Sequence, residues 1–271
     1  MPWSFPGHQL RLPARGCLSA DICYAEAVAP LIERSYPNRL IKKHAANTQE
    51  LPMTFTMNQA HSNMVWQQVR PNEVSHPEVL KALQQIDRAQ FVSDDYKALA
   101  YSDTRLPIGC GQFMWTPLEE GRILQFLQLK PSDSVLEVGT GSGFFTALIA
   151  GLSSNVISIE YFAELSALAG SRLEAADIQN VNLVCGDASH GWKLTDRIDV
   201  IVLTASCQQV PEDFLHALKV GGHLVIITGQ APAMQVQRIT RTGEWLWQTE
   251  TLFETVVAPM VHAEKKPEFI F

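Results

Sequence analysis

The sequence has no excess of basic residues. Of its 271 residues, 21 are Lys or Arg and 28 are Asp or Glu, so the formal net charge is −7 at pH 7. Proteins that mainly bind nucleic acids carry basic surfaces that neutralise phosphates. The charge therefore argues against a nucleic acid as the main partner, although a negative net charge does not exclude a local basic patch.

Cysteine is scarce, and its spacing is irregular. The sequence contains five cysteines and no CxxC pair, with the thiols at Cys17, Cys23, Cys110, Cys185 and Cys207. An odd, scattered set does not suit a disulfide framework or a zinc site. The eight histidines likewise form no cluster with the spacing of metal ligands. We therefore expect thiols in a reducing cytoplasm and no metal ion.

Long apolar runs are also missing. No segment reaches the roughly 18 apolar residues of a membrane-spanning helix. Residues 1–10 lack the basic segment followed by an apolar segment that is typical of a secretory signal. Hydrophobic residues make up 46% of the chain and charged residues 18%, an ordinary balance for a globular protein. We expect a cytoplasmic protein that has a sizeable core and no membrane association.

The character of the chain changes near residue 52. Residues 1–52 contain six of the 15 prolines and no sustained period beyond a short candidate helix over 22–33. We expect an N-terminal extension that is partly disordered or loosely packed, unless the natural chain starts at Met53 or Met57. Residues 53–271 are expected to form one domain.

The first part of this domain, residues 57–130, is expected to be helical around one loop. The sequence pattern suits helices over 57–70, over 75–86 with Ser75 as the capping residue, and over 117–129. Between them, Leu106–Gln112 is so rich in glycine and proline that we expect a loop.

From residue 134 onwards, strands alternate with helices. The expected strands cover 134–138, 155–159, 181–184, 198–203 and 223–228, and the expected helices cover 144–152, 163–176 and 211–218. This order predicts a parallel sheet with right-handed crossovers, in a doubly wound, Rossmann-like α/β fold. Segments 236–241 and 245–251 predict a hairpin that adds antiparallel strands at the sheet edge.

A glycine-rich loop, Glu137-Val-Gly-Thr-Gly-Ser-Gly143, follows the first of these strands and precedes a helix. Glycine lets a ligand approach the backbone closely, and doubly wound folds bind ligands at the carboxyl ends of their parallel strands. A dinucleotide loop needs G-x-G-x-x-G, whereas the spacing here is G-x-G-x-G, followed by Phe144. The acidic Glu137 suits the positive sulfonium and ammonium of S-adenosylmethionine better than a pyrophosphate.

Two further acids follow the next two strands. Glu160 closes the second strand, and Asp187 follows the third within Gly186-Asp187-Ala188. A carboxylate in the first position can accept hydrogen bonds from ribose hydroxyls, and one in the second can accept a hydrogen bond from the adenine amino group. Together with the glycine loop, the three acids favour S-adenosylmethionine over NAD as the cofactor.

The chain resembles the protein-L-isoaspartate O-methyltransferase family from about residue 86 to residue 261. The resemblance is carried by Arg88–Val92, Leu106–Gln112, Val135–Gly143, Gly186–Trp192 and Gly221–Val225, and Leu-Pro-Ile-Gly-x-Gly-Gln is its most specific element. It implies a seven-stranded methyltransferase sheet, mostly parallel with an antiparallel C-terminal hairpin. It also implies methylation of the free α-carboxyl of isoaspartyl residues in proteins or peptides, which starts the repair of damaged proteins.

The resemblance also implies which residues form the site. The expected cofactor-binding residues are Glu137, Gly139, Thr140, Gly141, Ser142, Gly143, Glu160, Tyr161, Gly186, Asp187 and Ala188. A substrate loop over residues 106–117 is expected to fold over the methyl donor, with Leu106, Ile108, Gln112, Phe113, Trp115 and Thr116 as its functional positions.

The substrate loop departs from the family at its centre. The family typically has Thr-Ile-Ser before a proline, and that serine is considered functionally essential. In this chain Phe113 stands in the threonine position and Trp115 in the serine position, so a hydroxyl is replaced by an indole with one N–H donor. Thr116 is displaced by one place and is expected to point elsewhere. The catalytic residue is therefore left unassigned.

Three hypotheses follow from the sequence. The first is a carboxyl methyltransferase that acts on isoaspartyl protein. The second is a methyltransferase with a different, more apolar acceptor, which Phe113, Met114 and Trp115 favour if they face the pocket rather than pack the loop onto the domain. The third is a non-catalytic module that binds the methyl donor.

Two other residues near the expected site are given minor roles. Cys207 follows the fourth strand, near the position where cytosine-C5 methyltransferases carry a thiolate nucleophile. The proline that normally precedes that cysteine is absent, and we expect Cys207 to be a plain loop thiol. His190 is expected to be structural.

Overall fold

The computed structural model describes residues 53–263. The expectations for residues 1–52 lie outside the described residues. The part before the large sheet contains α2 (Met53–Asn63), a π-helical turn (Met64–Val69), three 3-10 turns (Arg70–Asn72, Arg88–Phe91 and Asp94–Leu99), α3 (Pro77–Gln85), β1 (Leu106–Gly109), β2 (Gln112–Met114) and α4 (Pro117–Phe126). No helix within 53–263 is long and apolar enough to cross a membrane.

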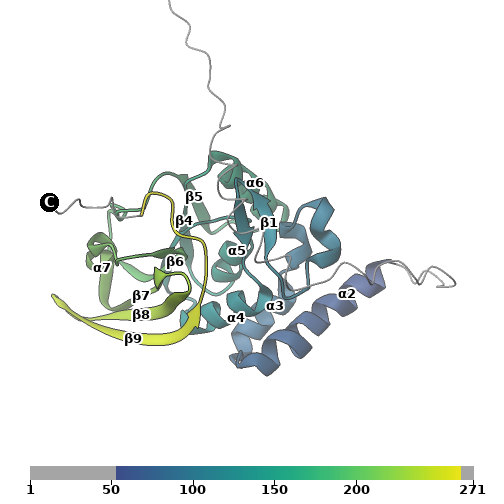
Figure 1. The fold of residues 1–271 in the computed structure, drawn as a ribbon, viewed down its shortest axis with the longest axis horizontal. Helices are drawn as coiled ribbons and strands as arrows, with labels where there is room; N and C mark the ends of the chain where they lie inside the picture. Colours follow the sequence, from purple (N-terminus) through teal and green to yellow (C-terminus); the bar gives the residue numbers. More distant parts are fainter. Residues whose placement is uncertain (1–52, 264–271) are drawn as a thin grey trace, which may run out of the picture. The chain divides into compact units, whose positions relative to one another are not determined.

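A seven-stranded sheet forms the rest of the fold. Its elements are β3 (Ser134–Val138), α5 (Phe144–Ala150), β4 (Asn155–Glu160), α6 (Ala163–Ala175), β5 (Val181–Cys185), β6 (Ile198–Cys207), α7 (Glu212–Ala217), β7 (Leu218–Gln230), β8 (Ala233–Gly243) and β9 (Leu246–Thr255). The strand order is β5-β4-β3-β6-β7-β8-β9. Strands β3 to β7 are parallel, and β8 and β9 add antiparallel strands at one edge (Figure 1). The expected doubly wound α/β fold is confirmed.

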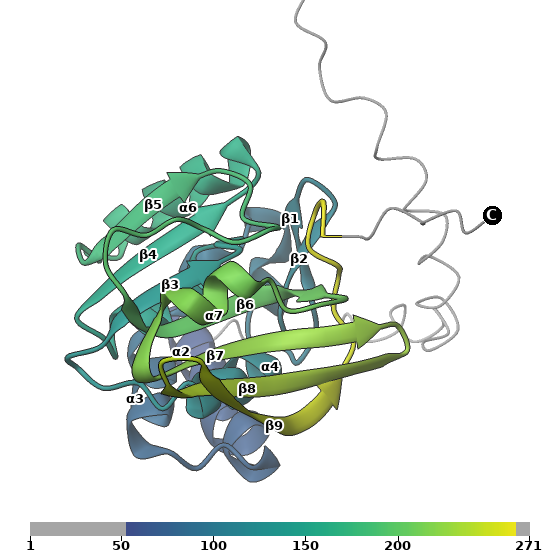
Figure 2. The same cartoon turned by 90° about the vertical axis from the view of Figure 1, so that its left-hand side faces the viewer.

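Both faces of the sheet are apolar, as a doubly covered parallel sheet requires. On one face, Val135 and Val202 belong to a core that includes α3, α4 and α5. On the other face, Leu136 and Leu203 pack in a second core with Phe214 of α7. Figure 2 shows α7 in front of the sheet and α2, α3 and α4 behind it. Alternate residues of each strand therefore serve opposite helical layers.

The start of α3 differs from the sequence prediction. The residue before its first turn is His76, and no side chain caps it from within the segment. The backbone N–H groups of Ser75 and His76 instead donate to Oε1 of Gln125, over 2.7 and 2.9 Å. The expected cap by Ser75 is therefore absent, and a residue of α4 instead holds the backbone just before α3.

The expected loop over Leu106–Gln112 contains regular structure. It forms a short antiparallel hairpin in which Leu106 pairs with Met114. Gly109, Cys110 and Gly111 close the hairpin with positive φ angles of 104°, 51° and 68°. The glycines that suggested an irregular loop are the turn residues of the hairpin, since glycine adopts positive φ at little cost.

Candidate active site

A cleft lies at the carboxyl ends of β3, β4, β5 and β6, between the glycine loop, the β1–β2 hairpin and the segment after β9. It contains about 950 Å³ of space including open solvent. The cleft opens where strand order reverses, between β3 and β6, as expected for a doubly wound sheet.

Most of the predicted site residues line this cleft. Of the predicted substrate-loop residues these are Ile108, Gln112, Phe113 and Trp115, and of the predicted cofactor-binding residues they are Gly139, Gly141, Glu160, Tyr161, Gly186, Asp187 and Ala188. The remaining predicted residues do not line the cleft, namely Leu106, Thr116, Glu137, Thr140, Ser142 and Gly143. The structure therefore brings the two predicted halves of the site together.

The glycine loop is held close to β6. Gly139 has a φ of 99°, and a Cβ at this position would lie 2.1 Å from Oγ1 of Thr204. That hydroxyl donates to the carbonyl of Gly139 over 2.8 Å. Any side chain at position 139 would break this contact, so the glycine is required by the packing of the loop on β6.

Glu160 joins the loop to the end of β4. Its Oε2 accepts a hydrogen bond from the N–H of Gly141 over 2.8 Å, and its Oε1 accepts one from the N–H of Phe162 over 3.0 Å. The side chain is 5% exposed and lines the cleft. Each carboxylate oxygen has a further lone pair for a ligand, so Glu160 can accept hydrogen bonds from a diol such as ribose.

Asp187 already has a partner. Its Oδ2 lies 2.7 Å from Nδ1 of His262, and its Oδ1 accepts a hydrogen bond from the N–H of Ser189 over 2.9 Å. The hydrogen bond with His262 is the main cause that lowers the pKa of Asp187 to about 2. The His262 ring also stacks edge-on against Tyr161, with ring centroids 5.1 Å apart. The C-terminal segment thus completes the wall beside Asp187.

Glu137 lies behind the glycine loop. It is fully buried, and its Oε2 accepts hydrogen bonds from Thr146 over 2.5 Å and from Ser158 over 2.6 Å. The hydroxyls of Thr140 and Ser158 are 2.5 Å apart. Burial raises the pKa of Glu137 to about 8. At neutral pH this side chain therefore links β3, β4, α5 and the loop as a neutral group, instead of presenting a charge to the cleft.

The three residues of the substrate-loop departure have different environments. Met114 is buried in the core and does not line the cleft. Phe113 lines the cleft and is 52% exposed. Trp115 lines the cleft but is only 8% exposed, and its ring packs edge-on against Phe145 with centroids 5.3 Å apart. Phe113 therefore fits the interpretation as an apolar pocket, Met114 fits packing of the loop onto the domain, and Trp115 fits both.

A buried ion pair holds the backbone at the end of the β1–β2 hairpin. Arg88 is paired with Glu120 of α4, and both side chains are at most 2% exposed. Nη2 of Arg88 also donates to the carbonyl of Trp115 over 2.5 Å. Thr116 points away from the cleft, as expected, and forms a capping box with Glu119 at the start of α4.

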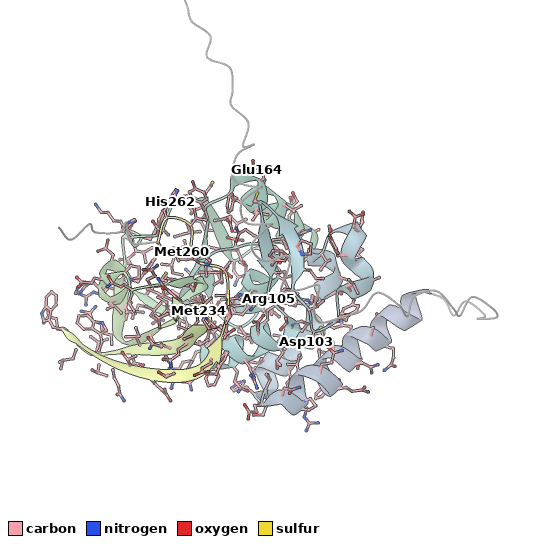
Figure 3. The ribbon with its side chains drawn as sticks, viewed as in Figure 1. Asp103, Arg105, Glu164, Met234, Met260 and His262 are labelled. Carbon is pink, nitrogen blue, oxygen red and sulfur yellow. The ribbon has the colours of Figure 1, made fainter. Side chains whose placement is uncertain are left out.

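Several cleft residues were not identified from the sequence. Arg105 precedes the hairpin, Thr204 lies within β6, and the segment 257–261 follows the last strand. Figure 3 shows Met260 and His262 of the C-terminal segment beside the sheet. This segment is held by β6, because Ser206 accepts a hydrogen bond from the N–H of Met260 over 2.8 Å. Such long-range contacts leave no local pattern in the sequence.

The two residues given minor roles lie outside the cleft lining. Cys207 ends β6 and is 1% exposed, so the expectation of a loop thiol is wrong. Burial raises its pKa to about 11, which keeps the thiol protonated and unsuited to nucleophilic attack. His190 forms a hydrogen bond with the hydroxyl of Ser189 over 2.7 Å. Within residues 53–263, no three His, Cys, Asp or Glu side chains are grouped to hold a metal ion.

Comparison with known proteins identifies close relatives of the chain. The sequence model described as protein-L-isoaspartate(D-aspartate) O-methyltransferase matches residues 58–265. A protein-L-isoaspartate O-methyltransferase of Aliivibrio fischeri is 36% identical over 205 residues, which cover 76% of this chain and 98% of the relative. One from a Picosynechococcus species is 41% identical over 166 residues, covering 61% of this chain and 75% of the relative.

A solved structure has the same fold. It is a Plasmodium falciparum chain described as a protein-L-isoaspartate O-methyltransferase in complex with S-adenosyl-L-homocysteine. The TM-score is 0.65 at 19% identity, over 74% of this chain and 97% of that chain.

The contacts of Glu160 predict a specific effect on donor binding. Glu160→Gln removes the charge that two backbone N–H groups and a ribose would share, and hydrogen bonds to a charged group are worth about 1.5–3 kcal/mol. We expect the Kd for S-adenosylmethionine, measured by calorimetry, to rise about ten- to a hundredfold. Glu164→Gln, an exposed acid in the first turn of α6, is the control and should bind normally. Unchanged affinity in Glu160→Gln would contradict this role.

The buried Glu137 predicts a pH-dependent stability. The pKa of this carboxyl is about 8 in the folded protein, whereas the pKa of an unperturbed Glu is 4.5. Between these values the unfolded state binds fewer protons, so the free energy of unfolding falls as pH rises, by up to about 1.4 kcal/mol per pH unit. Glu137→Gln removes this loss. Denaturant unfolding between about pH 5 and about pH 8 should show a variant that gains on the wild type as pH rises, and parallel curves would contradict the prediction.

Proposed function

This chain belongs to the protein-L-isoaspartate O-methyltransferase family and is a methyltransferase that uses S-adenosylmethionine, and we propose that it methylates the free carboxylate of isoaspartyl residues in proteins or peptides. This activity would act in protein repair, in the reducing cytoplasm that the scattered cysteines suit.

One observation carries the proposal: the β1–β2 hairpin and the glycine loop line the same cleft. A Cβ built on Gly141 would lie 3.2 Å from Cδ1 of Ile108, so the two segments are nearly in contact. An acceptor held by the hairpin is therefore placed next to a donor held by the loop. Such proximity is the main requirement of a transfer between two bound substrates.

The donor half of the cleft fits S-adenosylmethionine. We assign Glu160 to the ribose hydroxyls and Asp187 to the adenine amino group, because both carboxylates line the cleft and carry unused lone pairs. Gly139 and Gly141 let the ligand approach the backbone. Glu137 supports this wall from behind. When bound, S-adenosylmethionine supplies an electrophilic methyl group on a positively charged sulfur.

The transfer itself needs no acid or base from the protein. A lone pair of the acceptor carboxylate forms a bond to the methyl carbon, the carbon–sulfur bond breaks, and its electron pair stays on sulfur. Carboxylate and sulfonium thereby become a neutral ester and a neutral thioether. The chain's task is to align the two groups and to exclude water, for which Trp115, Phe113 and Met260 provide apolar lining.

The second candidate is transfer to a more apolar acceptor, and the position of Trp115 favours it. The indole lines the cleft where the family serine stands, and Phe113 lies beside it at the rim. A flat apolar or cationic acceptor would pack against these rings.

The proposed function predicts methyl transfer to an isoaspartyl peptide. Protein incubated with radiolabelled S-adenosylmethionine should label this peptide with a base-labile ester, and should leave the same peptide with an ordinary aspartate unlabelled. Glu160→Gln should lower the labelling at limiting donor. No labelling at saturating peptide, from protein shown by calorimetry to bind the donor, would reject this function.

Substitutions of Trp115 separate the two candidates. If the indole is only an apolar wall, Trp115→Phe should keep isoaspartyl activity within about threefold, because removing one modest interaction changes the rate little. Trp115→Ser opens a buried space and should cost about 3–5 kcal/mol of stability. A wild type that is inactive on the isoaspartyl peptide and a Trp115→Ser variant that gains this activity would favour the apolar acceptor.

A further inference from the structure

The charges that line the cleft are divided between its two halves. Glu160 and Asp187 lie at the ends of β4 and β5, on the donor side. Arg105, which immediately precedes the hairpin, is the cation among the described cleft residues. Figure 3 shows Arg105 well apart from His262, the partner of Asp187. This division suits a cationic methyl donor on one side and an anionic acceptor on the other.

Glu119 holds the guanidinium of Arg105 in place. Nε of Arg105 donates to Oε2 of Glu119 over 3.2 Å, and Nη2 donates to Oε1. The same carboxylate accepts hydrogen bonds from the N–H of Thr116 over 3.0 Å and from Oγ1 of Thr255 over 3.3 Å. Four donors from three parts of the fold thus fix Glu119 at the start of α4, and Arg105 with it.

The ion pair leaves donors for a ligand. A guanidinium has five N–H donors, and two of them bond to Glu119. The other three belong to a planar fork that matches a carboxylate. The Arg105 side chain is 35% exposed and Glu119 is 19% exposed, so the fork is accessible while its orientation is set in advance. A preoriented group binds with a smaller loss of entropy.

We propose that Arg105 binds the acceptor carboxylate and positions it in the cleft. This inference rests on the proposed function. Glu119 is a positioning residue that acts through Arg105. The alternative is that the pair only ties the hairpin to α4, and the experiment is designed to distinguish the two.

The test compares Arg105→Gln with a matched control in the isoaspartyl peptide assay. The negative charge of the carboxylate diminishes as the ester forms, so the contact acts mainly on acceptor binding. We expect KM for the peptide to rise about ten- to a hundredfold, kcat to stay within about threefold, and the Kd for the donor to stay unchanged.

The matched control is Arg122→Gln. Arg122 lies on α4, is 30% exposed and pairs with Glu73, but it does not line the cleft. Its substitution also removes a guanidinium that is paired with a glutamate, but at a position outside the cleft, and should leave KM unchanged. Arg105→Lys keeps the charge without the fork, and should raise KM less than Arg105→Gln.

Salt dependence provides a readout that a merely structural role would not change. An ion pair between protein and acceptor is screened by salt, so the wild-type KM should rise with ionic strength, whereas that of Arg105→Gln should stay flat. If Arg105→Gln does not fold, the comparison rests on Arg105→Lys and on the wild-type salt dependence.

The possible outcomes distinguish a failure of the Arg105 role from a failure of the proposed function. An active wild type together with Arg105→Gln of equal KM and equal salt dependence would overturn the role of Arg105 and leave the proposed function intact. A flat wild-type salt profile, with Arg105→Lys equal to the wild type, would overturn it in the same way. A wild type that binds the donor but does not methylate the isoaspartyl peptide would overturn both.

Discussion

The pairing of β3 with β6 positions the cleft on which the rest of this site depends. The two strands are neighbours in the sheet, with Val135 opposite Val200 and Val138 opposite Leu203. In the sequence, 59 residues lie between Val138, which ends β3, and Ile198, which begins β6. Because the chain leaves them towards opposite sides of the sheet, a crevice opens at their carboxyl ends. The hydroxyl of Thr204 then ties β6 to the glycine loop.

Each wall of the cleft depends on a buried polar group. Behind the glycine loop, Glu137 accepts hydrogen bonds from α5 and β4. Next to the β1–β2 hairpin, Arg88 pairs with Glu120 and holds the backbone at Trp115. Buried polar groups are costly unless they are paired. Their presence beneath both walls indicates that the position of each wall is specified by directional bonds as well as by apolar packing.

The distribution of charge and apolar surface suits a reaction that removes charge. A carboxylate and a sulfonium combine to give two uncharged products, so surroundings with few water molecules disfavour the separated ions more than the products. The lining of the cleft combines the acidic residues Glu160 and Asp187, the cation Arg105 and aromatic side chains. In the proposed function, each substrate is therefore held by opposite charge at its periphery while its reacting atoms meet against apolar walls.

Local pattern determined the large sheet, because buried strands must be apolar runs and their helices must alternate with them. Strands β3, β4 and β5 lie within one residue of their predicted ends. Local pattern also located the glycine loop, Glu160 and Asp187, since all three stand where a strand ends. The β1–β2 hairpin was missed because it is short and its glycines, which suggested a loop, form its turn.

Only the tertiary structure decided which groups meet. Glu137 was expected at the ligand, but it shares a face of β3 with Val135 and so points to the layer of α5. His262 reaches Asp187 across 75 positions, and Arg105 is oriented by Glu119 of α4. The sequence by itself determined the fold and the family and located the glycine loop, because these depend on local order. The direction of each charged side chain depends on contacts between distant segments, and therefore only folding decided it.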